Sequence, residues 1–238
     1  MRGRLLLVWR LARGDIRRRR AQSALLVVMI ATTITTLTLG LVLHGVTNSP
    51  FARTRAATKG PDAMALFEPG FHGSEGTFQQ FVALRQAPGV TASTGPYPVA
   101  ELELAARGAT IRVKAEGRDH DRAALDQPLV TAGNWTAPGG VVLERGFADA
   151  LGVHVGDTVL LNKQRFTVRG VALTSAMPTS DPLVWVTRGD LVALTGQSQP
   201  SWYTLNLKLA DPAGATAFAN AHNGPNTAWL LESWQQLR

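Results

Sequence analysis

The sequence predicts an α+β protein: one N-terminal transmembrane helix, followed by a mixed α/β domain of two small lobes outside the cytoplasm. Three observations lead to this prediction. Residues 21–43 form a run of 23 residues without a charge, and about 20 apolar residues are enough for a helix to span a bilayer. Basic residues gather on the N-terminal side of this run. After it, short helix and strand patterns follow one another in mixed order, as is typical of α+β domains.

The excess positive charge of the chain is confined to its first 20 residues. The 238 residues carry a formal net charge of +7, and residues 1–20 hold eight arginines against one acid, Asp15. The remaining residues are neutral on balance. A protein that binds nucleic acid would spread its positive charge over a folded face, so we expect no nucleic-acid partner. The chain has no Cys, which excludes a disulfide framework, a Cys-ligated zinc site and a thiol nucleophile.

The arginine cluster before the uncharged run predicts how the chain is oriented in the cell membrane. Basic residues are retained on the cytoplasmic side, which places the N-terminus in the cytoplasm and residues 44–238 outside it. A cleaved signal peptide is disfavoured, because its apolar region is only about 7–15 residues long. Six arginines form the orienting cluster: Arg10, Arg13, Arg17, Arg18, Arg19 and Arg20.

Residues 1–20 mix arginines with apolar side chains. We expect them to form a cytoplasmic interfacial helix against anionic lipid, and a disordered leader with a stop signal is the alternative. Within residues 21–43, Ala31, Thr35 and Thr38 fall on one helical face, which suits helix–helix packing in lipid. Plain lipid exposure is the alternative for that face. A Thr hydroxyl can bond to a carbonyl one turn earlier, which lowers the cost of its insertion.

Residues 44–59 contain Gly, Pro and small polar residues, so we expect a linker there and an outer domain over residues 60–238. In the first part of this domain, residues 63–67 are a short apolar stretch and residues 77–86 have a helical pattern ended by Pro88-Gly89. Residues 99–104 and 110–116 alternate around Arg107-Gly108, which predicts a β-hairpin.

The second part of the outer domain has clearer patterns. Asp211-Pro212 is typical of a helix start, and Gly152 follows a short helical pattern. The pattern predicts strands over 139–143, 158–161, 164–168, 171–173, 182–186 and 203–209, and helices over 144–151 and 213–221.

We find no motif for catalysis, cofactor binding or metal binding. None of the five His has a partner at i, i+4, and the sequence contains no HExxH, GxSxG or phosphate-binding loop. His120 stands between Asp119 and Asp121, but Gly117 and Pro128 nearby favour a solvated loop. We therefore expect a chain that is not an enzyme and holds no cofactor or metal.

The segment LERGFADALGVHVGDTVLLNKQRFTVRGVAL, residues 143–173, resembles the extracytoplasmic domain of FtsX-like and MacB-like ABC transporter permeases. Residues 58–62 also resemble family members from actinobacteria. The positions that carry the resemblance are structural. We expect Gly152 to cap a helix and Gly156-Asp157 to turn a hairpin. The pattern is filled by Leu143, Ala148, Leu151, Gly152, Val155, Gly156, Asp157, Val168, Gly170 and Val171.

The resemblance implies a MacB periplasmic-core-like fold and a permease subunit of an ABC transporter. It implies three partners: an ABC-type ATP-binding subunit that holds the ATP, a second permease copy, and membrane lipid. The permease would couple ATP hydrolysis to transport or mechanotransmission through its outer domain. A stand-alone, signal-anchored binding or adaptor protein is the alternative, and an anchored hydrolase has no supporting motif.

Family permeases continue with further membrane spans. Residues 227–238, TAWLLESWQQLR, resemble the amphipathic run before a second span, so we expect the chain to be the first part of a permease. Trp229 and Trp234 would suit a headgroup belt, and packing in a protein core is the alternative for both.

Overall fold

The computed structural model describes residues 20–70, 77–120, 122–175, 181–196, 200–224 and 227–236. Its contacts divide the chain into two compact units, Met1–Phe51 and Ala52–Arg238. Most of the predicted interfacial helix lies outside the described residues, as does Asp121. The same holds for five of the orienting arginines, namely Arg10, Arg13, Arg17, Arg18 and Arg19.

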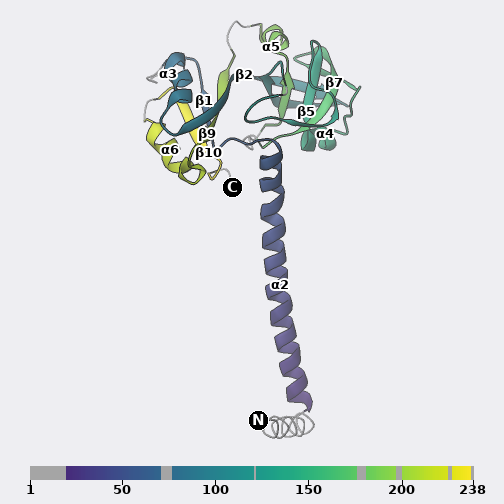
Figure 1. Ribbon diagram of the computed structural model, residues 1–238. Coiled ribbons are helices and arrows are strands. Elements are labelled where there is room, and N and C mark those ends of the chain that lie inside the picture. The colour runs from purple at the N-terminus through teal and green to yellow at the C-terminus, as the bar shows by residue number, and fades with distance from the viewer. Residues whose placement is uncertain are drawn as a thin grey trace. The chain divides into compact units, whose positions relative to one another are not determined.

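Helix α2 (Arg20–Ala57) contains the uncharged run in one continuous helix of 38 residues (Figure 1). Its threonine hydroxyls donate to carbonyls one turn earlier, as expected. Thr35 Oγ1 lies 2.8 Å from Ala31 O, and Thr38 Oγ1 lies 2.7 Å from Ile34 O. Over the stretches that are described, no helix is both long and apolar enough to cross a membrane.

The range 44–59, expected to be a linker, is helical as far as Ala57. The preference of Gly and Pro for turns is only local. Extending a helix that has already formed is favourable, because most further residues add a hydrogen bond. The helix ends in a Schellman motif. Gly60 N donates to Arg55 O at 2.7 Å, Lys59 N donates to Ala56 O at 3.3 Å, and Lys59 has a left-handed φ of 50°.

The described elements after α2 are strands with short helices between groups of them, the mixed order that the sequence predicts. In chain order they are β1 (Ala63–Phe67), α3 (Phe78–Ala83), η1 (Leu84–Gln86), β2 (Val90–Ala106), β3 (Ala109–Gly117), β4 (Leu129–Gly133), β5 (Gly140–Glu144), α4 (Arg145–Leu151), β6 (Thr158–Leu161), β7 (Gln164–Leu173), β8 (Leu183–Val186), α5 (Arg188–Thr195), β9 (Trp202–Leu209), η2 (Pro212–Gly214), α6 (Ala215–His222) and β10 (Trp229–Ser233).

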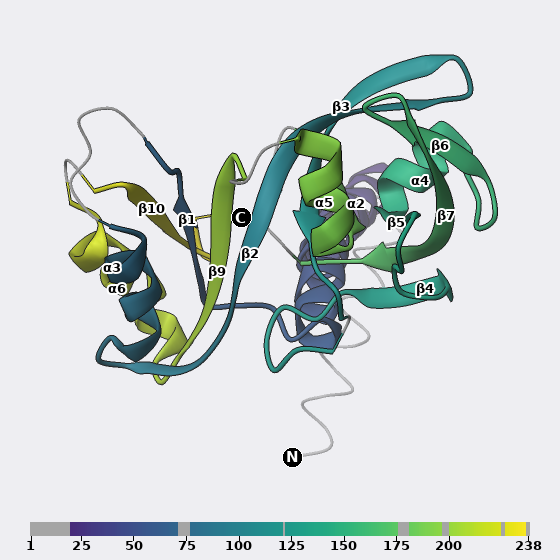
Figure 2. The same ribbon diagram turned by 90° about the horizontal axis from the view of Figure 1, so that it is seen from above.

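The first lobe is an antiparallel sheet in the order β10-β1-β9-β2. Its chain order is β1-α3-β2 and β9-α6-β10, which is the split βαβ arrangement. Helices α3 and α6 lie on the same side of this sheet (Figure 2). Phe81 of α3 and Ala219 of α6 are buried with Phe67, Leu205 and Leu231 of the strands in one core.

The second lobe is a closed ring of strands. β2 pairs with β3, β3 with β8, β8 with β5, β5 with β7, β7 with β6, and β6 returns to β2. Because the ring is closed, each of these strands pairs with a neighbour on both sides, and none is an edge strand of the ring. Leu104, Val113, Leu143, Leu161 and Val168 fill the core of the ring. Strand β4 pairs with the end of β7 outside the ring.

Strand β2 belongs to both lobes. Its residues 90–99 pair with β9 of the first lobe, and its residues 99–106 pair with β3 of the second lobe. In chain order, the second lobe is thus inserted between the two neighbouring strands β2 and β9 of the first.

Several predicted boundaries are confirmed, and others are wrong. The predicted helix over 77–86 begins at Thr77, whose hydroxyl accepts from Gln80 N. The predicted strand 99–104 is part of the longer β2, and the segments 164–168 and 171–173 form one strand, β7. The helix predicted over 213–221 begins with a 3-10 turn. Strand β4 and helix α5 are not expected from the sequence pattern.

Within residues 227–238, expected to be the amphipathic run before a second span, the central part forms strand β10. Alternating and helical patterns are hard to tell apart over five residues, and pairing with β1 decides the conformation. Trp229 packs partly buried against the core of the first lobe and donates from Nε1 to His222 O at 3.1 Å. The core-packing alternative therefore describes Trp229 in this structure.

Candidate functional site

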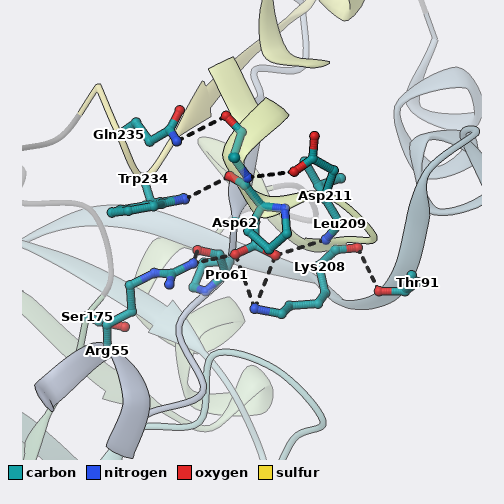
Figure 3. A network of polar contacts seen from close by, with 12 residues as sticks. Arg55, Pro61, Asp62, Thr91, Ser175, Lys208, Leu209, Asp211, Trp234 and Gln235 are labelled. Carbon is teal, nitrogen blue, oxygen red and sulfur yellow. Dashed lines mark hydrogen bonds and ion pairs between the residues drawn. The ribbon is translucent and has the colours of Figure 1, made fainter. Parts of the chain in front are cut away.

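The C-terminal end of α2 meets the outer domain at the buried carboxylate of Asp62. Asp62 directly precedes β1, and its side chain is fully buried. One carboxylate oxygen accepts from Leu209 N at 3.0 Å, and the other accepts from Lys208 Nζ at 3.1 Å (Figure 3). Its backbone also bonds to both neighbouring strands, through Leu207 O and Trp234 N. Asp62 is thus tied to β9 and to the end of β10.

Arg55, in the last turn of α2, supplies the second positive charge of this site. Its guanidinium forms an ion pair with Asp62 and donates to Pro61 O at 2.9 Å. The guanidinium carbon also lies 4.5 Å from the ring centre of Trp234, within the range of a cation–π contact. A buried carboxylate flanked by two cations and a backbone N–H is well compensated for its lost hydration. We call Arg55, Asp62, Lys208 and Trp234 the helix clamp.

The same end of α2 is bonded to the second lobe. Thr58 Oγ1 lies 2.7 Å from Ser175 Oγ, just after β7. Gln127 N donates to Thr58 O at 2.7 Å, and Asp126 N donates to Lys59 O at 2.9 Å. The carbonyls at a helix end have no partner within the helix, and here they are bonded by the segment that leads into β4. The end of α2 is therefore fixed to both lobes.

A second charged cluster lies directly beside these contacts. The side chain of Arg118 is 2% exposed, and its Nη2 donates to Asp126 Oδ2 at 2.7 Å. It also forms an ion pair with Glu116 Oε1, and its guanidinium carbon lies 3.8 Å from the ring centre of Tyr97. Asn206 Nδ2 on β9 donates to Asp126 Oδ2 at 3.0 Å. We call Glu116, Arg118, Asp126 and Asn206 the interlobe cluster, because it joins β3 and β9.

The interlobe cluster contains two carboxylates and one guanidinium, so it balances its charge only if one carboxyl group is protonated. Burial raises the pKa of Glu116, and the neighbouring Asp126 raises it further, against the opposing effect of Arg118. Burial on its own would lower the pKa of Arg118, but Glu116 and Asp126 outweigh it and the pKa is raised. In this cluster, burial therefore favours the neutral form of Glu116, while Arg118 keeps its charge.

The structure also places the site residues predicted from the sequence. Gly152 ends α4 with a left-handed φ of 63°, so its predicted role as a helix cap is confirmed. Gly156 has a φ of 96° and donates to Val168 O, and Asp157 Oδ2 accepts from His154 N at 3.0 Å in the same turn. A Cβ at Gly170 would collide with the carbonyl oxygen of Asn134. These positions build the ring of the second lobe.

The remaining predicted site residues lie apart from the helix clamp. Arg20 is the first residue of α2, and Ala31, Thr35 and Thr38 are exposed within their own unit. His120 is exposed as well. In the part of the chain that the structure describes, no group of His, Cys, Asp and Glu is arranged to hold a metal ion.

Neither the helix clamp nor the interlobe cluster is expected from the sequence, in which residues 58–62 stand out only as a family pattern. A charged residue beside a predicted turn and strand, as Asp62 is, is the one local indication of a polar anchor. Lys208 lies 146 residues from Asp62, and Thr204 lies 88 residues from Glu116, so no local pattern connects these pairs.

Together these features define a two-lobed α/β domain fixed to the end of a long helix. The family model described as "MacB-like periplasmic core domain" matches residues 23–223. The chain belongs to this family, and the resemblance to MacB-like permeases is confirmed. By its description, this family is one of periplasmic core domains like that of MacB.

Two solved structures illustrate the similarity. The periplasmic region of MacB from Actinobacillus actinomycetemcomitans is 16% identical, with a TM-score of 0.45 over 76% of this chain and 92% of that one. The extracellular domain of the ABC-type transporter YknZ from Gram-positive bacteria is 13% identical, with a TM-score of 0.44 over 72% of this chain and 100% of that one. No curated protein matches the chain.

Proposed function

We propose that the chain is the N-terminal part of an integral membrane permease subunit of an FtsX/MacB-type ABC transporter. Residues 21–43 would cross the cell membrane with the N-terminus in the cytoplasm, oriented by the arginine cluster. Residues 44–238 would lie outside the cytoplasm. An ATP-binding subunit would hydrolyse ATP, and a second permease copy would complete the transporter. Family membership and the distribution of charge support this proposal.

The helix clamp is the observation that carries the proposed coupling role. Asp62 is fully buried and bonded to Arg55 of α2 and to Lys208 and Leu209 of β9. Breaking one member of a buried ion pair leaves an uncompensated charge and is strongly unfavourable. When the end of α2 is displaced, the first lobe therefore moves with it.

The bonds from Thr58 and Lys59 give the helix end a second point of attachment. They reach the segment of Asp126 and Gln127, which belongs to the second lobe. A rotation of the last helical turn acts on both lobes, at points on different sides of the shared strand β2. Rigid-body movement of packed elements is a common way to transmit a conformational change. In this proposal, ATP-driven movement of the helix changes the relative position of the two lobes.

The proposal is tested by measuring the distance between the lobes during ATP turnover. The chain has no Cys, so Gln79→Cys and Asp149→Cys, at exposed positions of α3 and α4, can carry a donor and an acceptor dye. The full-length permease is reconstituted in lipid nanodiscs with an ABC-type ATP-binding subunit. We expect ATP to change the energy transfer between the dyes, and Arg55→Met to abolish this change while ATPase binding remains.

Arg53→Met is the matched control, because Arg53 is exposed on the same helix and should keep the ATP-dependent change. If Arg55→Met leaves the change intact, the coupling role is wrong. If the full-length protein binds no ATP-binding subunit, the coupling role is also wrong, and the stand-alone adaptor is favoured.

A further inference from the structure

A cavity of about 510 Å³ opens beside the first lobe, away from the helix clamp. It lies where the end of β1 and the starts of β9 and β10 meet the hairpin of β2 and β3. Its volume falls within the roughly 300–1,000 Å³ of small-molecule sites. Neither the proposed coupling role nor the family pattern uses its residues.

The walls of the cavity are mainly apolar and aromatic. Leu66 and Phe67 of β1 and Leu230 of β10 line it together with Trp202 and Trp229. Leu230 is 53% exposed, so part of this apolar lining is open to a ligand. Aromatic walls supply a large contact area for an apolar body, and also a face for a cation.

Trp229 and the loop at the rim are held in place before any ligand binds. Trp229 donates from Nε1 to His222 O at 3.1 Å, and Thr227 Oγ1 donates to Trp229 O at 2.9 Å. The side chain of Asn223 bonds to both backbone groups of Leu231, at 2.7 and 2.8 Å, and fixes the loop at the rim. A site that is ordered in advance loses less entropy when it binds a ligand.

The charged residues of the cavity are Glu68, Glu101 and Lys114. Glu101 and Lys114 stand directly opposite each other on β2 and β3. Nevertheless Lys114 Nζ lies over the ring of Trp202, 5.4 Å from its centre. Among the ion pairs of the described residues, none includes Glu68 or Glu101. The cavity therefore offers two carboxylates without a cationic partner and has a net negative charge.

We propose that this cavity binds a small organic molecule with an apolar body and one cationic nitrogen. The apolar body would lie between Trp229, Leu66 and Leu230, and the cation would face Glu68 and Glu101. The two carboxylates repel anionic ligands, and a neutral ligand gains no charge contact with them. This proposal does not depend on coupling to an ATPase, because it needs only the folded outer domain.

Three compounds that share a phenyl ring on a short alkyl chain and differ in their polar end group test the proposal: 4-phenylbutylammonium, 4-phenylbutanol and 4-phenylbutyrate. Their binding to the full chain in nanodiscs is measured by tryptophan fluorescence, with empty nanodiscs as the reference for membrane partition. We expect the ammonium compound to bind about five- to tenfold more tightly than the alcohol, which corresponds to an exposed charge contact with two carboxylates. The carboxylate compound should bind most weakly.

Variants separate the charge contribution from the apolar one. Glu68→Gln with Glu101→Gln should remove the preference for the ammonium compound and leave the affinity for the alcohol. Trp229→Ala should weaken both. Glu103→Gln is the matched control, because Glu103 is exposed two residues along the same strand and lies outside the cavity lining. It should change neither affinity.

Equal binding of the ammonium compound and the alcohol would overturn the proposal, as would an unchanged preference in the double Gln variant. Absence of saturable binding by all three compounds would overturn it as well. The two Gln substitutions lie at exposed positions, so they test the proposal even if Trp229→Ala does not fold.

Discussion

At the scale of single residues, Glu116 is a carboxyl side chain whose ionisation the fold opposes. It is 5% exposed and lies beside Arg118 and Asp126. Thr204 Oγ1 donates to its Oε2 at 3.3 Å, and the Arg118 guanidinium lies over the Tyr97 ring. Burial and the Asp126 charge both favour the neutral carboxyl group and raise its pKa.

This raised pKa predicts a pH dependence of stability. Because the folded protein keeps the proton on Glu116 to a higher pH than the unfolded chain does, the free energy of unfolding falls as pH rises through that interval. Glu116→Gln is neutral at every pH and should lack this fall. Urea unfolding of the full chain, measured in steps from about pH 4 to 8, should show a shallower decrease for the variant than for the wild type.

Glu103→Gln is the control for this prediction, since Glu103 is an exposed carboxylate on the neighbouring strand. It should preserve the pH dependence of the wild type. Identical slopes for the wild type and Glu116→Gln would mean that the proton is not held on this carboxyl group.

At the scale of elements, β10 is an edge strand whose open side is closed by side chains. The Asn223 side chain donates to Leu231 O and accepts from Leu231 N. Farther along the strand, Gln236 Oε1 accepts from Ser233 N at 2.8 Å. Free backbone groups at a sheet edge invite pairing with another chain. These side chains satisfy the outer edge of β10 in place of a further strand.

Asn223→Ala should therefore have two effects. Loss of two hydrogen bonds to one buried residue should lower the free energy of unfolding by about 1–3 kcal/mol. The uncovered edge should also increase self-association, which light scattering of the full chain in nanodiscs detects as a rise in mass. Asn220→Ala, at an exposed position of α6, should change neither quantity. A destabilised but strictly unassociated Asn223→Ala protein would refute the edge-protection role.

The elements also differ in how far the sequence predicts them. Helix α4 is predictable because its determinants are adjacent: Glu144 caps its first turn and Gly152 ends it. β10 is not, because its conformation depends on pairing with β1, more than 160 residues earlier in the chain. Its pattern Trp-Leu-Leu fits a helix equally well.

At the scale of the whole outer domain, the shared strand β2 predicts that both lobes unfold together. β2 pairs with β9 through residues 90–99 and with β3 through residues 99–106, so melting of either lobe removes pairing from the other. Leu161→Ala in the second lobe and Leu231→Ala in the first each delete a fully buried side chain. Each should lower the stability by about 3 kcal/mol, and both should shift one common urea transition.

Near-ultraviolet circular dichroism and tryptophan fluorescence of the full chain should report the same midpoint for each variant. Leu129→Ala, at a position that is 42% exposed on β4, is the control and should have a small effect. Two separate transitions, with each substitution shifting only one of them, would show that the lobes are independent.

The sequence by itself determined the features that depend on neighbouring residues. The uncharged run and the separation of charge are properties of composition along the chain, and the helix α4 with the turn before β6 depends on residues a few positions apart. These follow from local hydrogen bonding and side-chain periodicity. They also carried the resemblance to the family.

Only the tertiary structure decided how these parts are connected. It inserts the closed ring of the second lobe between β2 and β9, and it brings Asp62 to Lys208 and Glu116 to Thr204 across 146 and 88 residues. The burial of a carboxylate is favourable only where cations and donors from distant segments meet it. These long-range contacts depend on the packing of the whole domain, so no single stretch of the sequence predicts them.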